Sequence, residues 1–183
     1  RKGMVGVKFE RKTSNLSLDT SDTAYFKSIF KEIQKTIDPG CRIVDPFARN
    51  CKIEGYDHQT NDLDESTKAE YHLDAKDFMR LQDRDTADLV IFDPPFSPHQ
   101  AERYTRGMKN IYTNAGYINE LMIEIDRVLK PGAYILKFGF NSTRHRGHWE
   151  LVKVWIVNHG GNHNDTIVSL WRSMTHTVGE FLL

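Results

Sequence analysis

The stretch Ala87-Asp88-Leu89-Val90-Ile91-Phe92 runs directly into Asp93-Pro94-Pro95-Phe96, and this segment decides the fold. Residues 89–92 form a continuous apolar run with no polar alternation. Such a run is typical of a parallel strand that is covered on both faces. We therefore predict a buried strand over 87–92 that ends in an acid, two prolines and an aromatic residue.

The sequence on either side of this strand alternates helices with further strands. One amphipathic helix is predicted over 25–37, capped by Ser21 or Asp22, and another over 114–130. Apolar segments predict strands at 42–44, 52–60, 71–73, 133–138, 151–157 and 166–171. The last two flank Gly160-Gly161 and indicate an antiparallel hairpin. We expect an α/β fold with a doubly wound, mostly parallel sheet and an antiparallel terminal hairpin.

The composition narrows the class of protein. The chain has 183 residues, with 25 basic and 25 acidic side chains. That length predicts a single domain over 1–183, in which residues 1–20 are an N-terminal extension that is flexible in part. No apolar run approaches 18 residues, so neither a membrane span nor a membrane partner is expected. Cys41 and Cys51 predict free thiols in a cytoplasmic protein, and the histidines lack metal-ligand spacing, so no metal is expected.

Acidic residues follow the predicted strands at their carboxyl ends. Asp45, Asp62 and Asp93 each come at or just after a strand, and Asp74 follows the weaker segment 71–73. Ligands of doubly wound sheets bind beyond this edge. An isolated Asp after a strand is usually a turn former or a helix cap, but the shared placement of these residues favours a ligand site.

Asp93-Pro94-Pro95-Phe96 resembles the signature of the amino-methylating branch of the S-adenosylmethionine-dependent methyltransferases, D/N/S-P-P-Y/F/W after the fourth strand. The resemblance covers most of the chain and implies a Rossmann-like class I methyltransferase fold. It also implies S-adenosyl-L-methionine as cofactor and an exocyclic amine of a nucleobase as methyl acceptor, with adenine N6 in DNA favoured. An RNA base methyltransferase of the same fold and a catalytically inactive nucleic-acid- or partner-binding subunit are the alternatives, and an ordinary proline-rich turn is the simplest explanation of the motif alone.

The motif has a chemical reason. An exocyclic amine is a poor nucleophile because its lone pair is conjugated with the ring. The Asp93 carboxylate and the Pro94 carbonyl can each accept one amine N–H and so direct the lone pair toward the methyl donor. Pro95 helps to fix the backbone, and Phe96 can stack on a base that is flipped out or single-stranded.

The cofactor half of the resemblance rests on the start of the family's D-P-F-x-G-x-G motif. Asp45 and Phe47 match it, but Arg49 and Cys51 stand in the two glycine places. Arginine does not adopt a positive φ as easily as glycine. Either Arg49 reaches the carboxylate of the donor, or cofactor binding is weakened or lost.

The resemblance assigns three more residues to the adenosyl part of the cofactor. Asp62, with Asp64 as the alternative, corresponds to the acid that binds the ribose hydroxyls. Asp74 resembles the acid that contacts the adenine amine. Phe78 is expected to flank the adenine ring or, equally well, to fill the core.

Nucleic-acid recognition is assigned to two basic segments. Arg103, Tyr104 and Arg106 follow the Asp-Pro-Pro-Phe motif, while Arg144 and Arg146 follow the strand at 133–138. Both segments fit a phosphate-binding surface, although solvated charge explains either equally well. DNA is favoured over RNA as the partner. Because 183 residues leave no room for a separate target-recognition domain, we expect weak specificity, a specificity partner or a homo-oligomer.

Overall fold

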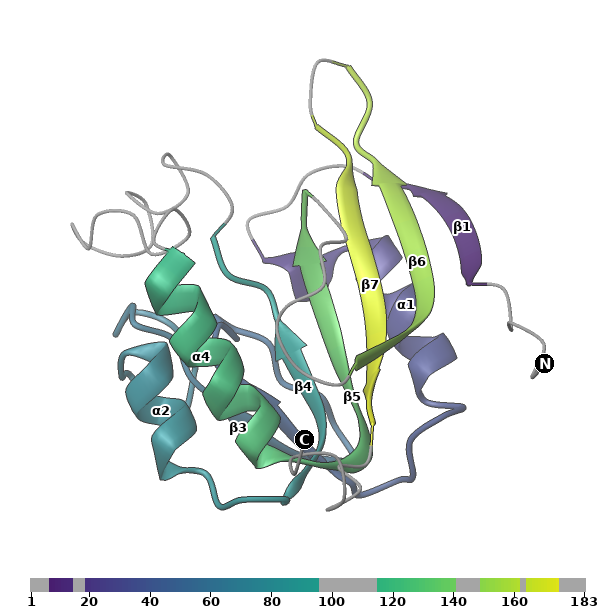
Figure 1. Ribbon diagram of the computed structural model, residues 1–183. Coiled ribbons are helices and arrows are strands. Elements are labelled where there is room, and N and C mark those ends of the chain that lie inside the picture. Colours follow the sequence, from purple (N-terminus) through teal and green to yellow (C-terminus); the bar gives the residue numbers. More distant parts are fainter. Residues whose placement is uncertain (1–6, 15–18, 96–114, 141–148, 162–163, 175–183) are drawn as a thin grey trace, which may run out of the picture.

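The computed structural model describes residues 7–14, 19–95, 115–140, 149–161 and 164–174. Its strands are β1 (Lys8–Thr13), β2 (Arg42–Asp45), β3 (Asp57–Thr60), β4 (Ala87–Phe92), β5 (Leu129–Gly139), β6 (Trp149–Asn158) and β7 (Thr166–Ser173). They form one seven-stranded sheet in the order β1-β6-β7-β5-β4-β2-β3 (Figure 1). Only β7 runs against its neighbours β5 and β6, so the sheet is mostly parallel with an antiparallel terminal hairpin, as predicted.

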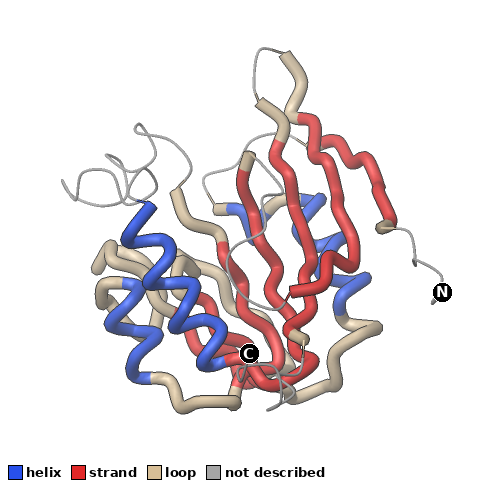
Figure 2. Tube along the Cα trace, in the orientation of Figure 1, coloured by secondary structure: helices blue, strands red, loops and turns tan. Residues whose placement is uncertain are grey.

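Helices cover both faces of the sheet. They are the 3-10 turn η1 (Thr20–Asp22) and the α-helices α1 (Ala24–Ile33), α2 (Ala75–Leu81) and α4 (Ala115–Val128). One face carries α1, and the other carries α2 and α4 side by side (Figures 1 and 2). Within the described residues, no helix is both long and apolar enough to span a membrane.

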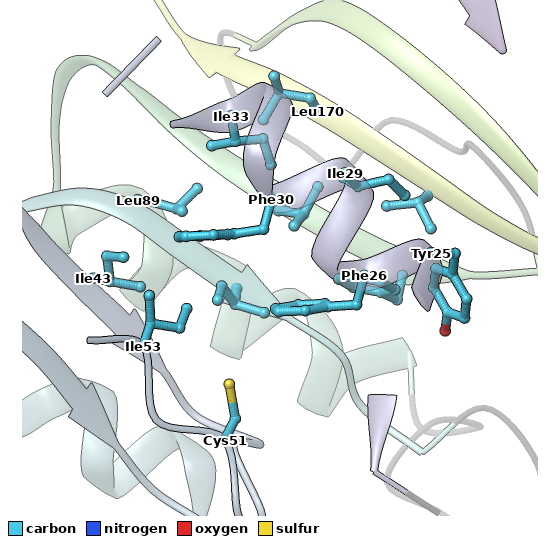
Figure 3. Packing of buried hydrophobic residues seen from close by; sticks show 14 of the residues in the cluster. Tyr25, Phe26, Ile29, Phe30, Ile33, Ile43, Cys51, Ile53, Leu89 and Leu170 are labelled. Atoms are coloured by element: carbon cyan, nitrogen blue, oxygen red, sulfur yellow. The ribbon is translucent and has the colours of Figure 1, made fainter. Parts of the chain in front are cut away.

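The central strands are buried on both faces because their alternate side chains enter two separate cores. Ile43 and Leu89 face α1, where Phe26, Phe30 and other apolar side chains cover them (Figure 3). The next residue of each strand, Val44 or Val90, enters the second core beneath α2 and α4. This arrangement explains why β4 lacks polar alternation, and its bounds are those predicted.

Several predicted elements are shorter in the structure. Helix α1 ends at Ile33 and is capped by Thr23, whose Oγ1 accepts the Phe26 N–H at 3.2 Å. The predicted caps Ser21 and Asp22 belong instead to the 3-10 turn. The strand predicted over 52–60 covers only Asp57–Thr60. In place of the strand at 71–73 there is a single parallel bridge between Asn61 and Tyr71.

Part of the predicted N-terminal extension is a strand, which the sequence did not predict. Strand β1 pairs in parallel with β6 from Lys8↔Lys153 to Thr13↔Asn158. Its sequence, Lys-Phe-Glu-Arg-Lys-Thr, contains too few apolar residues to predict a strand.

Ion pairs hold β1 in place. Glu10 contacts the Nζ atoms of Lys12 and Lys153, each at 2.7 Å. Both lysines also contact Glu32 of α1, so the four residues join β1, β6 and α1. Hydrogen bonds from Lys12 and then Lys153 lower the pKa of Glu10 from its ordinary value of 4.5 to about 2.

We expect Glu10 to make stability pH-dependent. Because its folded-state pKa lies below its unfolded value, ionised Glu10 stabilises the fold above about pH 4.5, and this contribution disappears as the pH falls toward 2. Glu10→Gln should therefore cost up to about 1 kcal/mol at pH 7, where solvent screens a partly exposed pair, and only a small fraction of that at pH 2. Urea unfolding at both pH values measures the difference. Glu54→Gln, at an exposed position, is the matched control, and a difference for Glu10→Gln that does not change with pH would contradict the assignment.

Candidate active site

The acids predicted to share an edge do come together at the carboxyl ends of three neighbouring parallel strands. Asp45 is the last residue of β2 and lies opposite Thr60, the last residue of β3. Asp62 follows β3 by two residues, and Asp93 directly follows β4. Asp45 and Asp93 are close enough for the charge of Asp45 to raise the pKa of Asp93. The edge of the sheet is therefore an acidic site built from residues far apart in the sequence.

Asp93 is the most perturbed of these acids. Burial raises the pKa of its carboxyl from 3.8 to about 7, the Thr20 hydroxyl opposes this shift by hydrogen bonding, and Asp45 adds to it. Pro94 is buried and Pro95 is partly buried. Phe96 lies outside the described residues, so its predicted stacking role stays a prediction.

Of the two residues in the predicted glycine places of the loop after β2, Arg49 has a positive φ and Cys51 does not. Asp45 Oδ1 accepts the Phe47 N–H at 3.1 Å, and the Phe47 ring meets Phe92 edge-on at 5.8 Å between centroids. Arg49 has φ +49°, the left-handed conformation that glycine adopts freely and other residues adopt at a cost of about 1 kcal/mol. The turn at Arg49 is therefore strained.

Two aspartates hold Arg49 in this conformation. Its backbone N–H donates to Asp62 Oδ2 at 3.2 Å. Its side-chain Nε donates to Asp19 Oδ1 at 2.5 Å, and the neighbouring Asn50 donates to Asp19 Oδ2 at 2.9 Å. Asp19 thus connects the N-terminal segment to the loop after β2.

Asp62 has the surroundings of a ligand-binding acid. It is buried, and its two oxygens accept the N–H groups of Arg49 and Asp64. Burial raises its pKa, an effect that these backbone donors partly offset. Each carboxylate oxygen has a second lone pair, so Asp62 can still accept a hydroxyl from a ligand such as a ribose.

Asp74 and Phe78 differ in how well they fit the predicted adenine site. Asp74 caps α2 by accepting the Lys76 N–H, and the Tyr117 hydroxyl donates to its carboxylate at 2.9–3.0 Å. The remaining lone pairs of Asp74 suit an amine donor. Phe78 is fully buried against the ring of Tyr71, and this placement favours its core role.

The residues expected to bind nucleic acid cannot be placed on the site. Arg103, Tyr104, Arg106, Arg144 and Arg146 all lie outside the described residues. Their role stays a prediction.

Several residues that build the site belong to no recognisable sequence motif. Asn61 is fully buried, and its amide joins Pro46 of the first loop to Leu73 of the segment before α2. The N-terminal segment contributes Asp19, Thr20 and, through a hydrogen bond to Cys51, Ser21. These are ordinary polar residues in the sequence, and only tertiary contacts give them a place in the site.

Comparison with known proteins supports the fold. No family model and no curated protein matches the sequence. Among solved structures, the chain is similar to "Putative methyltransferase yhhF from Escherichia coli", with 14% identity, coverage of 81% of this chain and 84% of that chain, and a TM-score of 0.54. It is also similar to TrmN from Thermus thermophilus, with 14% identity and a TM-score of 0.61; the match covers 86% of this chain but only about half (51%) of TrmN. The chain therefore has a Rossmann-like methyltransferase fold.

A buried cluster of Asp45, Cys51 and His58 lies under the first loop. One potential ligand atom from each residue lies within 4.8 Å of the others, an arrangement that the sequence did not predict. His58 Nδ1, however, accepts the Ile53 N–H at 3.0 Å. In neutral His58 the hydrogen must then be on Nε2, which lies 3.7 Å from Asp45 Oδ2. A metal at Nε2 would have to displace that hydrogen, so this tautomer suits support of the loop better than metal binding.

We predict that the Nδ1 acceptor of His58 stabilises this loop. His58→Leu should cost about 1–3 kcal/mol, because it leaves the buried Ile53 N–H without an acceptor. His58→Asn should recover most of that loss, since the Asn oxygen occupies nearly the same place as Nδ1. Urea unfolding and hydrogen exchange at the Ile53 amide measure the effect. Equal losses in the two variants would show that packing, and not this hydrogen bond, is the contribution of His58.

Proposed function

We propose that this protein is an S-adenosylmethionine-dependent methyltransferase that acts on an exocyclic amine of a nucleobase. The observation that carries the proposal is the partly buried Asp93, whose pKa is raised, followed by Pro94 and Pro95, at the same sheet edge as Asp45 and Asp62. The methyltransferase fold supports it. Adenine N6 in DNA and a base amine in RNA are the two acceptors to separate by experiment.

The residues at the carboxyl edge fit the cofactor chemically. Asp62 has lone pairs left for the ribose hydroxyls, and Asp74 for the adenine amine. Asp45 and Phe47 shape the loop that follows β2. When bound, S-adenosylmethionine supplies an electrophilic methyl group on a sulfonium. What the chain must supply is orientation, because methyl transfer needs donor and acceptor in line.

Asp93 and Pro94 supply the acceptor side of that alignment. Ionised Asp93 accepts one N–H of the base amine, and the Pro94 carbonyl accepts the other. Both hydrogen bonds strengthen as positive charge develops on the nitrogen during transfer, so they stabilise the transition state more than the ground state. After transfer, the excess proton of the amine can pass to Asp93, whose pKa of about 7 suits a base near neutral pH.

The rival proposal is an inactive binding subunit, and the state of Asp93 argues against it. An acid whose pKa is raised in the folded state reduces the stability of the fold at neutral pH. A subunit that only binds has no use for such a residue beside an oriented carbonyl.

We propose the basic segments 97–109 and 144–146 as the nucleic-acid surface and a partner or second copy as the source of target choice.

Calorimetric titration with S-adenosylmethionine is the first test, and we expect binding in the micromolar to millimolar range. Transfer of labelled methyl to unmethylated DNA and to RNA then identifies the acceptor. Asp93→Ala should lower transfer by about 100-fold or more while leaving cofactor affinity nearly unchanged. Failure to bind at millimolar donor would overturn the enzyme proposal, and equal losses of binding and transfer in the variant would show that Asp93 is not on the acceptor side.

The pKa of Asp93 predicts a pH profile. Single-turnover transfer should rise from pH 6 to 8 with an inflection near 7, because only the ionised carboxylate accepts the amine N–H and the proton. Burial raises the pKa of Cys51 to about 12 and that of Tyr25 still higher, so these neighbours do not titrate in that range.

Asp93→Asn is the matched control for this profile. Its amide oxygen still accepts one N–H, so a reduced rate should remain but should no longer rise through pH 7. The variant should also be more stable than the wild type by about 1–3 kcal/mol at pH 8 and not at pH 4, since the raised folded-state pKa destabilises the wild type progressively as the pH rises from 3.8 to about 7. An unchanged inflection in the variant would assign the profile to another group.

A further inference from the structure

The ion pair between Arg49 and Asp19 lies where two parts of the candidate site meet. Arg49 belongs to the loop after β2, and its backbone N–H binds Asp62. Asp19 precedes η1, whose first residue Thr20 hydrogen-bonds to Asp93. The pair is therefore connected on one side to the proposed ribose acid and on the other to the proposed acceptor acid.

The pair is partly shielded from water, and a third residue fixes its orientation. The Arg49 side chain is 22% exposed and that of Asp19 is 15% exposed. Asn50 donates to the second oxygen of Asp19, which fixes the orientation of the carboxylate. Arg49 keeps a left-handed backbone to make this contact, although a glycine would adopt the same turn without strain.

The shape of the donor indicates what belongs beside this pair. The sulfonium of S-adenosylmethionine carries an adenosyl group, a methyl group and an amino-acid arm. If the ribose is at Asp62 and the methyl group faces Asp93, the arm leaves the sulfur in a third direction. Asp19 and Arg49 form a charged pair that is connected to both acids and is therefore within reach of that arm. The end of that arm is a zwitterion, with a carboxylate and an ammonium on one carbon.

We propose that Asp19 and Arg49 together bind the amino-acid end of the methyl donor. The Arg49 guanidinium pairs with the α-carboxylate, and the Asp19 carboxylate accepts N–H bonds from the α-ammonium. The two charges of the ligand meet two opposite charges that are already held in place, so the complex gains no net charge and needs little reorganisation. The inference rests on the proposed function and goes beyond it by adding Asp19 and by giving the Arg49 side chain a purpose that glycine cannot serve.

Three ligands distinguish this binding role from a purely structural role, in which the pair only holds the loop closed. S-adenosylmethionine has both charges of the zwitterion, decarboxylated S-adenosylmethionine has only the ammonium, and 5′-methylthioadenosine lacks the arm. Calorimetry on the wild type should show S-adenosylmethionine binding at least about tenfold more tightly than the decarboxylated ligand. Arg49→Gly restores the family residue at an unstrained position and should reduce that preference to about one.

Asp19→Asn tests the other charge. It should weaken S-adenosylmethionine and the decarboxylated ligand by about the same factor, at least about fivefold, because both contain the ammonium. Neither variant should change the affinity for 5′-methylthioadenosine, and this ligand reports whether the adenosyl site is still formed.

The outcomes distinguish the inference from the function on which it rests. Equal affinities of the wild type for the first two ligands, or an undiminished preference in Arg49→Gly, would overturn the inference while leaving the methyltransferase proposal intact. A parallel loss of all three ligands in either variant would also overturn it, by showing that the pair only holds the loop closed. If none of the three ligands binds the wild type, the proposed function fails as well.

Discussion

The amide side chain of Asn61 is the contact on which the geometry of the site depends. It is fully buried; its Nδ2 donates to the carbonyls of Pro46 and Leu73, and its Oδ1 accepts the Leu73 N–H. Its backbone N–H donates to Asp45, and its carbonyl accepts from Ala48. Only a carboxamide offers donors and an acceptor at this spacing, so neither Asp nor Leu can replace it without leaving buried groups unsatisfied. The strand expected at 71–73 is reduced to one bridge, so few backbone hydrogen bonds connect this segment to β3. The hydrogen bonds of Asn61 make that connection instead, and they bring Asp45, Asp62 and the segment before α2 together.

Around this contact, the fold keeps two locally unfavourable features. Asp93 is a partly buried acid whose pKa is raised to about 7, and Arg49 has a positive φ, which glycine adopts more easily. Residues that reduce stability persist where the surrounding structure determines them and where they serve a function. Both are at the carboxyl edge of the sheet, and both are contacted by the short N-terminal segment before α1. These two unfavourable features therefore lie at the same edge of the sheet as Asp45 and Asp62.

The sequence predicted the parts of the fold that depend on local patterns. The strand at 87–92, the helix over 114–130 and the terminal hairpin have strong apolar periodicity, and the structure has all of them within a few residues. It also placed Asp45, Asp62 and Asp93 at one edge, because the carboxyl ends of parallel strands meet. It missed β1, where ion pairs replace apolar burial, and it missed Asn61, His58 and Asp19, whose roles arise only from contacts. Arg49 and Asp19 are 30 residues apart, and no spacing rule connects them.

The strained turn at Arg49 depends on the N-terminal segment. A free glycine turn needs no support, but a strained arginine turn needs its partner held in place. The described segments on either side of Asp19 in the chain are both fixed to the rest of the fold. Before it, β1 pairs with β6, and the Ser14 N–H donates to the Asn158 carbonyl at 3.1 Å. After it, the Thr23 cap begins α1, whose side chains enter the core. Asp19 therefore binds the Arg49 side chain, and the Arg49 N–H binds Asp62. By this sequence of contacts, the N-terminal segment belongs to the site as fully as the strand ends do.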